Sequence, residues 1–492
     1  MPDGLRVLFL ASEADPLVKI GGLGDVAGSL SKALCNLPPE PGSQPMDVRL
    51  VIPFHGAIQR EAYSLSHAAS LQVPYQGGVT PADVFSLDLD GLPVYLISGP
   101  LIPPEAPVYT SDAGVDGKKY SFFSLAALVL ARAVGWAPHI LHANDWHTAL
   151  AIYALSLTRD RDPFFNKTAT ILGLHNLPYL GMGVGPALDA FDLPPAVDSQ
   201  LPKWAQRLPL PLGLLTADRV IAVSPTYARE ILTPEFGSGL HNFLRIRADA
   251  ISGILNGLDA QYWDPRRDIL LAVQFDQDTL ADRQVNKRAL QNELGLEADG
   301  DQPLFSIVAR MDYQKGLDLV PGALRAIADQ PWQAVILGTG DPILGAAFRK
   351  LEADFPRQVR SVIRYDASLS HRIYGGADSL LIPSRYEPCG LTQMIAMHYG
   401  CVPVARATGG LRDTIQDYSQ SAQSTGFLFD DPTSDALATA LVRVLQVFKD
   451  KGEWQRLQRI GMAQDFSWRR SARQYLAAYQ SLVSTRSLDS KN

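Results

Sequence analysis

Residues 6–34 read RVLFLASEADPLVKIGGLGDVAGSLSKAL and join a strand pattern to a helix pattern. The apolar run 6–11 predicts a short buried strand, and a helical segment follows the glycines. The apolar residues on one face of that helix are Val26, Ala27, Leu30, Ala33 and Leu34. Asp25 stands where a side chain that caps the start of a helix is expected. A strand that passes through a glycine-rich turn into a helix is the repeating unit of a parallel α/β sheet.

The same pattern recurs along the 492 residues, a length that suits two domains. The predicted strands are 6–11, 48–53, 94–97, 140–143, 168–174 and 219–223, then 304–309, 334–337, 361–364, 379–382 and 402–405. Two such series predict an α/β fold with two Rossmann-like, doubly wound domains. We place the domains at 1–255 and 256–464, followed by a segment 465–492. In that segment 465–483 has the spacing of an amphipathic helix, and 484–492 is expected to fray.

Composition narrows the classes of function. Lys and Arg number 44 against 51 Asp and Glu, a formal charge of −7, which argues against nucleic acid and anionic membranes as partners. Cys35, Cys389 and Cys401 are too few for a disulfide framework or a four-ligand metal site. We find no secretory signal and no apolar run long enough to span a membrane. These features predict a cytoplasmic protein without a metal.

The glycine-rich loop of the first strand can be interpreted in two ways. Gly21 and Gly22 lie between strand and helix, where backbone amides and the start of a helix can bind an anion. Lys19 would then offer an ammonium to a diphosphate. An ordinary tight turn with a surface lysine explains the same residues, and this stretch alone does not decide between them.

Two further strand ends in the first half carry polar side chains. Residues 142–147 read HANDWH, with Asp145 between two histidines, and His175-Asn176 ends the next predicted strand. The histidines suggest a metal, but no third group of ligands supports one, so a polar strand end that lines a cleft is favoured. His175 could face a substrate or pack beneath a loop.

Three strand–helix junctions in the second half carry charge or glycine. Arg310 and Lys315 follow one strand and could together hold the two phosphates of a nucleoside diphosphate, unless they are solvated surface cations. Glu387 follows another strand, where a carboxylate can accept hydrogen bonds from sugar hydroxyls. Gly409 and Gly410 mark the third junction. Three such junctions on one sheet edge indicate a ligand site.

Residues 338–341, GTGD, imitate a dinucleotide-binding fingerprint. The position three after Gly340 is Ile343 rather than glycine, so the fingerprint is incomplete. We therefore do not expect a nicotinamide cofactor, or any other cofactor.

Taken together, the motifs resemble those of the bacterial glycogen synthase and plant starch synthase family, the family 5 retaining glycosyltransferases of GT-B fold. The resemblance runs from about residue 6 to residue 479. It rests on 19–25 KIGGLGD, 142–147 HANDWH, 222–230 AVSPTYARE, 255–259 LNGLD, 314–319 QKGLDL, 370–373 SHRI, 383–393 PSRYEPCGLTQ and 465–468 DFSW. Ile20 stands where the family usually has Thr.

The resemblance implies glucose transfer from ADP-glucose, or UDP-glucose, to the non-reducing end of an α-1,4-glucan, in a cleft between the two domains. It implies that the last helix crosses back onto the first domain. It assigns the diphosphate to Arg310 and Lys315, with Lys19, Gly21 and Gly22 closing from the other domain. It assigns the donor sugar and phosphate to Glu387, Cys389, Gly390, Leu391 and Thr392, and adds Asp145, His175, Gly409 and Gly410 to the site. Tyr365 is a candidate for contact with the nucleotide base.

The chain departs from the family pattern in its first half. Residues 207–213, RLPLPLG, replace a block that usually contains Asn or Ser and Lys, and 118–123, KKYSFF, lack the usual Asp, Asn and Arg. Two alternatives therefore stand beside a glucan synthase: a related glycosyltransferase with another acceptor or donor sugar, and a non-catalytic glucan-binding relative. The intact set Lys19, Arg310, Lys315 and Glu387 argues against the non-catalytic relative.

Overall fold

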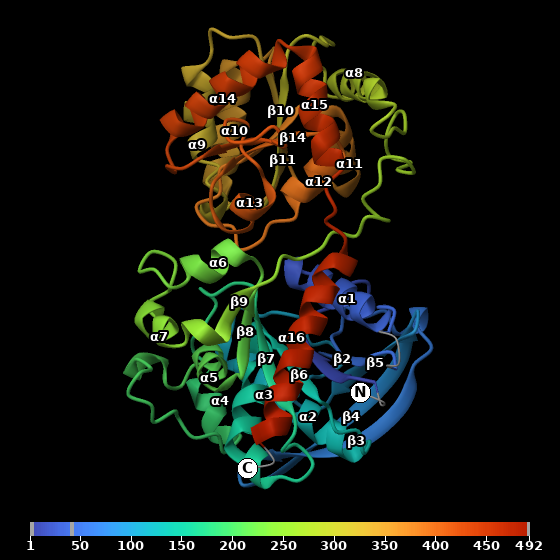
Figure 1. The fold of residues 1–492 in the computed structure, drawn as a ribbon, viewed down its shortest axis with the longest axis vertical. Helices are drawn as coiled ribbons and strands as arrows, with labels where there is room; N and C mark the ends of the chain where they lie inside the picture. Colours follow the sequence, from blue (N-terminus) through green and yellow to red (C-terminus); the bar gives the residue numbers. More distant parts are fainter. Residues whose placement is uncertain (1–3, 40–43, 490–492) are drawn as a thin grey trace. The chain divides into compact units, whose positions relative to one another are not determined.

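The computed structural model describes residues 4–39 and 44–489, and these divide into two compact units (Figure 1). Unit 1 consists of Met1–Val223, Ala228–Gly257 and Trp468–Asn492. Unit 2 consists of Ser224–Tyr227 and Leu258–Ser467. The division after Gly257 and before Trp468 lies two to three residues from the domain limits that the sequence suggested.

Within the described residues, unit 1 contains one nine-stranded sheet, in the order β3-β4-β5-β2-β1-β6-β7-β8-β9. The strands are β1 (Arg6–Leu10), β2 (Asp47–Pro53), β3 (Ser66–Tyr75), β4 (Gly78–Leu89), β5 (Leu92–Ser98), β6 (Ile140–Asn144), β7 (Ala169–Leu174), β8 (Arg219–Ala222) and β9 (Ile251–Gly253). From β5 to β9 neighbouring strands are parallel, and β1 pairs with β2 and β6 at the centre. The strands β3, β4 and β5 form an antiparallel meander.

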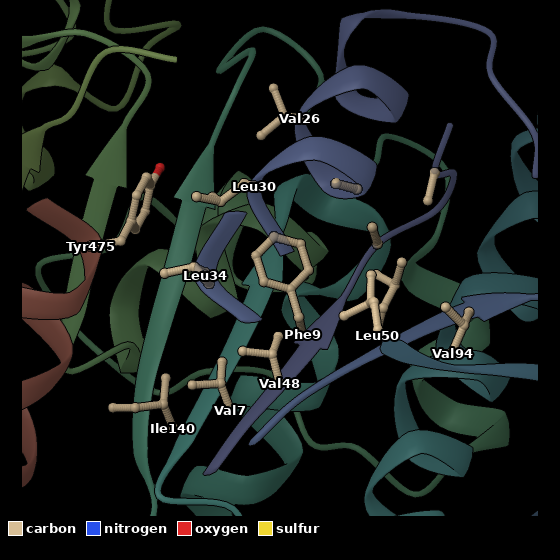
Figure 2. Packing of buried hydrophobic residues seen from close by; sticks show 14 of the residues in the cluster. Val7, Phe9, Val26, Leu30, Leu34, Val48, Leu50, Val94, Ile140 and Tyr475 are labelled. Carbon is tan, nitrogen blue, oxygen red and sulfur yellow. The ribbon is translucent and has the colours of Figure 1, made fainter. Parts of the chain in front are cut away.

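The helices of this part of the chain are α1 (Gly22–Cys35), α2 (Ala113–Ala133), α3 (Asp145–Thr158), α4 (Gly185–Ala190), α5 (Pro209–Thr216), α6 (Pro225–Glu230), α7 (His241–Ile246) and α16 (Trp468–Asp489). The last helix, α16, packs beside α1 and against β7 (Figure 1). One apolar cluster joins the buried face of α1 to β1, β2, β5 and β6, and Tyr475 of α16 completes it (Figure 2). The helix that ends the chain is therefore part of the core of unit 1.

Two sequence predictions about helix ends are wrong. Helix α1 begins at Gly22 with Gly21 as its cap residue, so Asp25 lies inside the first turn and is not the cap. At the other end of the chain, α16 continues to Asp489 instead of fraying after residue 483. The Arg486 guanidinium donates to the backbone oxygen of Asn166 and pairs with Asp160, which ties this last part of the helix to unit 1. Residues 490–492 lie outside the described part.

Unit 2 contains a parallel sheet of six strands in the described residues, in the order β12-β11-β10-β13-β14-β15. Its strands are β10 (Leu304–Val308), β11 (Gln333–Gly338), β12 (Val359–Ile363), β13 (Ser379–Ile382), β14 (Val402–Arg406) and β15 (Phe427–Phe429). Its helices are α8 (Arg283–Glu293), α9 (Leu319–Ala326), α10 (Pro342–Asp354), α11 (Ala367–Gly376), α12 (Thr392–His398), α13 (Gly409–Thr414), α14 (Ser434–Phe448) and α15 (Lys451–Met462). Each unit is thus a Rossmann-like α/β domain, as predicted. Among the residues that the structure describes, no helix combines the length and apolarity that crossing a membrane requires.

Candidate active site

Polar side chains gather where parallel strands end, the edge at which open α/β sheets bind ligands. In unit 1 they follow β1, β6 and β7, and in unit 2 they follow β10, β13 and β14.

The glycine-rich loop after β1 is held by the buried carboxylate of Glu13. Its Oε2 accepts hydrogen bonds from the backbone amides of Ile20 and Gly21, the latter at 3.1 Å. Its Oε1 accepts one from the Tyr109 hydroxyl at 2.8 Å. A buried carboxylate requires such donors, and these donors fix the loop ahead of α1. The sequence analysis missed Glu13, although a carboxylate directly after a buried strand was a signal that could have identified it.

The loop presents Lys19 and open glycines. The Lys19 ammonium lies 2.5 Å from an oxygen of Asp25, and about half of the lysine side chain is exposed. A Cβ added to Gly22 would meet no atom within 4 Å, and one on Gly21 would meet only Glu13, at 3.6 Å. Close packing therefore does not explain these two glycines, and their role in ligand binding stays a prediction.

Asp145 and His175 come together at the ends of β6 and β7. Asp145 has a left-handed backbone (φ 51°), and its Oδ1 accepts hydrogen bonds from the amides of His175 (2.8 Å) and Asn176 (3.3 Å). The His175 Nε2 lies 2.8 Å from Asn144 Oδ1. Since Asn144 Nδ2 donates to the Leu10 carbonyl, its Oδ1 is the acceptor, and His175 carries its proton on Nε2.

Burial changes the acid–base properties of this pair. It raises the pKa of the Asp145 carboxyl, against the opposing effect of His175 and the two amides. It lowers the pKa of His175, so the imidazole is neutral near pH 7 and its Nδ1 is an acceptor. A carboxyl and a neutral imidazole at the ends of two neighbouring strands suit the recognition of hydroxyl groups.

The other histidines of the 142–147 motif are structural. His142 Nδ1 lies 2.7 Å from the Tyr479 hydroxyl of α16, and His147 packs against Trp146 and Tyr120. In the described part of the chain, no group of three or more His, Cys, Asp or Glu side chains is arranged to hold a metal ion.

The two predicted cations of unit 2 lie in the loop after β10 and are both held by carboxylates. Arg310 Nε donates to Asp312 Oδ2 at 2.5 Å. Lys315 is the last residue of a 3₁₀ turn, Tyr313–Lys315, and its Nζ donates to both carboxylate oxygens of Glu387, at 2.9 and 2.7 Å. Ser384 Oγ donates to the same carboxylate at 2.8 Å. The structure thus brings Lys315 and Glu387 together, while Arg310 lies beside Asp312, a residue that the sequence analysis did not select.

The loop that contains Glu387 packs tightly against the start of α13. A Cβ on Gly409 would lie 2.0 Å from the Glu387 carbonyl oxygen, and one on Gly410 would lie 2.0 Å from that of Cys389. The Gly410 amide donates to the Glu387 carbonyl at 3.0 Å. Both glycines are therefore required by packing, and they position the residues Cys389, Gly390, Leu391 and Thr392 at the start of α12.

Ser224–Tyr227, part of unit 2, supports the same loop. The Ser224 hydroxyl donates to the Pro388 carbonyl at 2.6 Å, and Thr226 donates to Asp413 of α13 through its amide and its hydroxyl, both at 2.7 Å. Residues 224–227 of the motif therefore hold the Glu387 loop and α13. The side chain of Tyr365 follows β12 and is 83% exposed, so it is available to a ligand but has a site role only as a prediction.

The GTGD sequence of residues 338–341 serves packing. A Cβ on Gly338 would lie 2.1 Å from the Ala309 carbonyl oxygen, and one on Gly340 would lie 2.3 Å from that of Met311. The Met311 amide also donates to the Thr339 carbonyl at 2.8 Å. The glycines let the loop that contains Arg310 lie directly on the neighbouring strand end.

The two segments that depart from the family pattern are ordered and polar in part. Lys119 is buried, pairs with Asp116 at 2.7 Å and donates to the carbonyls of Pro107 and Val108. The segment 118–123 thus lacks the usual Asp, Asn and Arg but contains a buried charged contact between Lys119 and Asp116. In the second segment, Arg207 pairs with Asp189 at 2.7 Å.

Comparisons with known proteins agree with each other. The family model described as "Starch synthase catalytic domain" matches residues 6–246, and "Glycosyl transferases group 1" matches residues 292–456. The chain is 42% identical over 486 residues to "Glycogen synthase" of Anaeromyxobacter dehalogenans, covering 97% of this chain and 100% of that protein. It is 39% identical over 495 residues to "Glycogen synthase 2" of Nitrosococcus oceani, covering 97% and 98%.

Two solved structures resemble the chain over nearly its whole length. The catalytic domain of starch synthase IV from Arabidopsis thaliana, bound to ADP and acarbose, matches with a TM-score of 0.86 and 32% identity, over 98% of this chain and 100% of that chain. Sucrose-phosphate synthase from Thermosynechococcus elongatus matches with a TM-score of 0.59 and 20% identity, over 98% and 100%, which shows a shared fold.

Proposed function

The chain belongs to the glycogen synthase and starch synthase family of GT-B glycosyltransferases, and on this premise we propose that it transfers glucose from ADP-glucose to the non-reducing end of an α-1,4-glucan, with retention of anomeric configuration. The enzyme class, a hexosyltransferase, follows from the family. ADP as the nucleotide is supported by the starch synthase IV structure, which was solved with ADP bound. The same proposal places the enzyme in a reducing compartment, the cytoplasm, where the thiols of Cys35, Cys389 and Cys401 stay reduced.

The observation that carries the proposal is the pair of cations after β10, each next to a carboxylate at the ligand-binding edge of a parallel sheet. Transfer breaks the bond between the anomeric carbon and a diphosphate oxygen, and the electron pair stays on that oxygen. We assign Arg310 and Lys315 to this developing charge, as a guanidinium fork and a point charge. The chemistry needs cationic stabilisation more than a strong general acid, and these groups supply it without a metal.

Residues of unit 1 are assigned to the sugar. The acceptor hydroxyl oxygen bonds the anomeric carbon from the face that the diphosphate leaves, and its proton passes to the departing diphosphate. Asp145 and the neutral His175 are proposed to hold the transferring glucose by its hydroxyl groups. Lys19 and the open glycine turn at Gly21 and Gly22, which no side chain fills, are proposed to meet the diphosphate.

The remaining unit 2 residues are proposed to hold the donor. Glu387 would accept hydrogen bonds from glucose hydroxyls, and the backbone of Cys389, Gly390, Leu391 and Thr392 would meet the phosphates at the start of α12. Gly409 and Gly410 position that backbone. Tyr365 is proposed to contact the base by stacking, because its ring is exposed.

The experiment that tests the proposal is transfer of radiolabelled glucose to glycogen. ADP-glucose and UDP-glucose are compared as donors, with and without glycogen. Glycogen-dependent incorporation, faster from ADP-glucose, is the expected result. Faster incorporation from UDP-glucose would overturn the choice of nucleotide.

The same assay separates the alternatives. Release of nucleoside diphosphate without growth of glycogen would indicate another acceptor, and attention would move to the segment around Arg207. Absence of both donor binding and transfer would indicate a non-catalytic relative and contradict the proposed function.

A further inference from the structure

One carboxylate, that of Asp312, contacts both of the residues to which the diphosphate is assigned. Its Oδ2 accepts a hydrogen bond from Arg310 Nε at 2.5 Å. Its Oδ1 accepts one from the backbone amide of Lys315 at 3.0 Å, and this caps the 3₁₀ turn Tyr313–Lys315. The two oxygens of one side chain therefore fix the guanidinium of one cation and the backbone of the other.

The two contacts act on different parts of the cations. The bond to Nε holds the guanidinium by its inner edge and limits the rotation of a long side chain that is 62% exposed. An exposed arginine otherwise loses rotamer freedom when it binds a ligand, and a side chain that is already oriented loses less. The bond to the Lys315 amide fixes the backbone from which Nζ reaches Glu387.

A second Arg-x-Asp sequence in unit 2 shows what is particular to this one. Arg364 donates to Asp366 Oδ2 at 2.9 Å, and Asp366 Oδ1 caps α11 through the Leu369 amide at 2.9 Å. The cap to the third following amide is shared, but Arg364 donates through a terminal guanidinium nitrogen instead of Nε, and the capped residue is a buried leucine. At Asp312 the capped residue is a lysine, so this copy of the motif joins two cations.

We propose that Asp312 is a positioning residue for donor binding, which holds Arg310 and Lys315 in the arrangement that a nucleoside diphosphate requires. The assignment rests on the proposed function, and it adds a residue that does not itself touch the substrate. The positioning role also explains why a carboxylate, that of Asp312, lies next to a site proposed to bind the negatively charged diphosphate. The cost of repulsion between Asp312 and the phosphates is offset by the prior orientation of both cations.

The test compares three variants with the wild-type chain. Asp312→Asn keeps an oxygen that can cap the 3₁₀ turn but places a neutral amide beside Arg310 Nε. Asp312→Ala removes both contacts. Asp354→Asn is the matched control, because its carboxylate also serves two cations, Arg325 at 2.7 Å and Lys350 at 3.3 Å. Binding of ADP is measured by calorimetry, KM and kcat by glucose transfer, and stability by thermal unfolding.

We expect Asp312→Asn to raise both the Kd for ADP and the KM for ADP-glucose about three- to tenfold, with an unchanged melting temperature. Asp312→Ala should raise both further and also lower the melting temperature, and Asp354→Asn should leave both constants unchanged. ADP binding by Asp312→Asn that is as tight as in the wild type, or tighter, would overturn the assignment. A fall in melting temperature without a change in Kd would reduce Asp312 to a structural residue. Failure of the wild-type chain to bind ADP would instead overturn the proposed function, and this assignment with it.

Discussion

The Lys315 ammonium donates to both carboxylate oxygens of Glu387, at 2.9 and 2.7 Å. Both side chains are largely buried, at 23% and 8% exposure. A buried ion pair of this kind is costly to break, because removal of one partner leaves the other charge without compensation. The pair therefore fixes the position of the cation before a ligand arrives.

The first prediction concerns this pair. Glu387→Gln and Lys315→Met are each expected to lower kcat/KM for glucose transfer by about 100-fold or more, because each leaves a misplaced partner. Since the two side chains act as one unit, the double variant should be little worse than either single variant. Losses that simply multiply in the double variant would contradict this coupling.

The second prediction is that Arg310→Ala removes nearly all turnover while the protein stays folded. The side chain is 62% exposed, so its loss should hardly change the melting temperature. Loss of a cation that stabilises the leaving group is expected to lower kcat by about 100- to 1,000-fold. Arg325→Ala serves as the control, because Arg325 forms a similar pair with Asp354 on α10, outside the proposed site. Wild-type turnover in Arg310→Ala would remove Arg310 from the site.

The third prediction concerns the glycine-rich loop. Glu13→Gln keeps the size of the side chain but puts a neutral amide among three donors, two of them backbone amides. At least one donor then loses its acceptor, and the variant should be less stable by about 1 to 3 kcal/mol. The KM for ADP-glucose should also rise, because Lys19 lies in this loop.

Tyr109→Phe is the graded comparison for Glu13→Gln. It removes one donor and leaves both amides bound, so its effects on stability and on KM should be smaller and in the same direction. An equal KM in Glu13→Gln and in the wild-type chain would show that the loop does not take part in donor binding.

Parallel strands such as β1, β7 and β11 were predictable because they are buried and consist mostly of apolar residues. The parallel strands β9 and β15 were not predicted, because each is only three residues long. The hairpin of β3 and β4 was not, because its apolar residues, such as Leu71, Val73 and Val84, occur at every second position with exposed residues between them. That alternation is typical of antiparallel strands with one face in water. An alternating pattern contains no continuous apolar run, so the two strands did not stand out in the sequence.

The candidate-site residues show the same contrast between what stands out in the sequence and what only the structure reveals. Lys19, Arg310, Lys315 and Glu387 were selected from the sequence because charged side chains at strand–helix junctions stand out there, and their site roles stay predictions. Glu13 and Asp312 were not selected, since their importance depends on which amides and cations they face. The glycines show the same limit, because only the packing distinguishes Gly340, which lies against Met311, from Gly22, which faces open space.

The last prediction is that acid destabilises unit 1 through its buried histidines. Burial lowers the pKa of His142 to about 3 and that of His55 to about 4, from an ordinary value of 6.5. Both lie in unit 1, and within the described residues His142 Nε2 and His55 Nδ1 are buried without a hydrogen-bond partner. The unfolded chain therefore binds protons at a pH at which the folded chain does not.

The sign follows from proton linkage. Between the folded and unfolded pKa values the unfolded state binds more protons, so stability falls as the pH falls from about 6.5 toward 4. Each histidine contributes a slope of about 1.4 kcal/mol per pH unit. The free energy of unfolding, measured by urea titration at about pH 5 and 6, should fall less steeply in His142→Gln than in the wild-type chain. An unchanged slope in His142→Gln would show that His142 does not stay neutral in the folded protein.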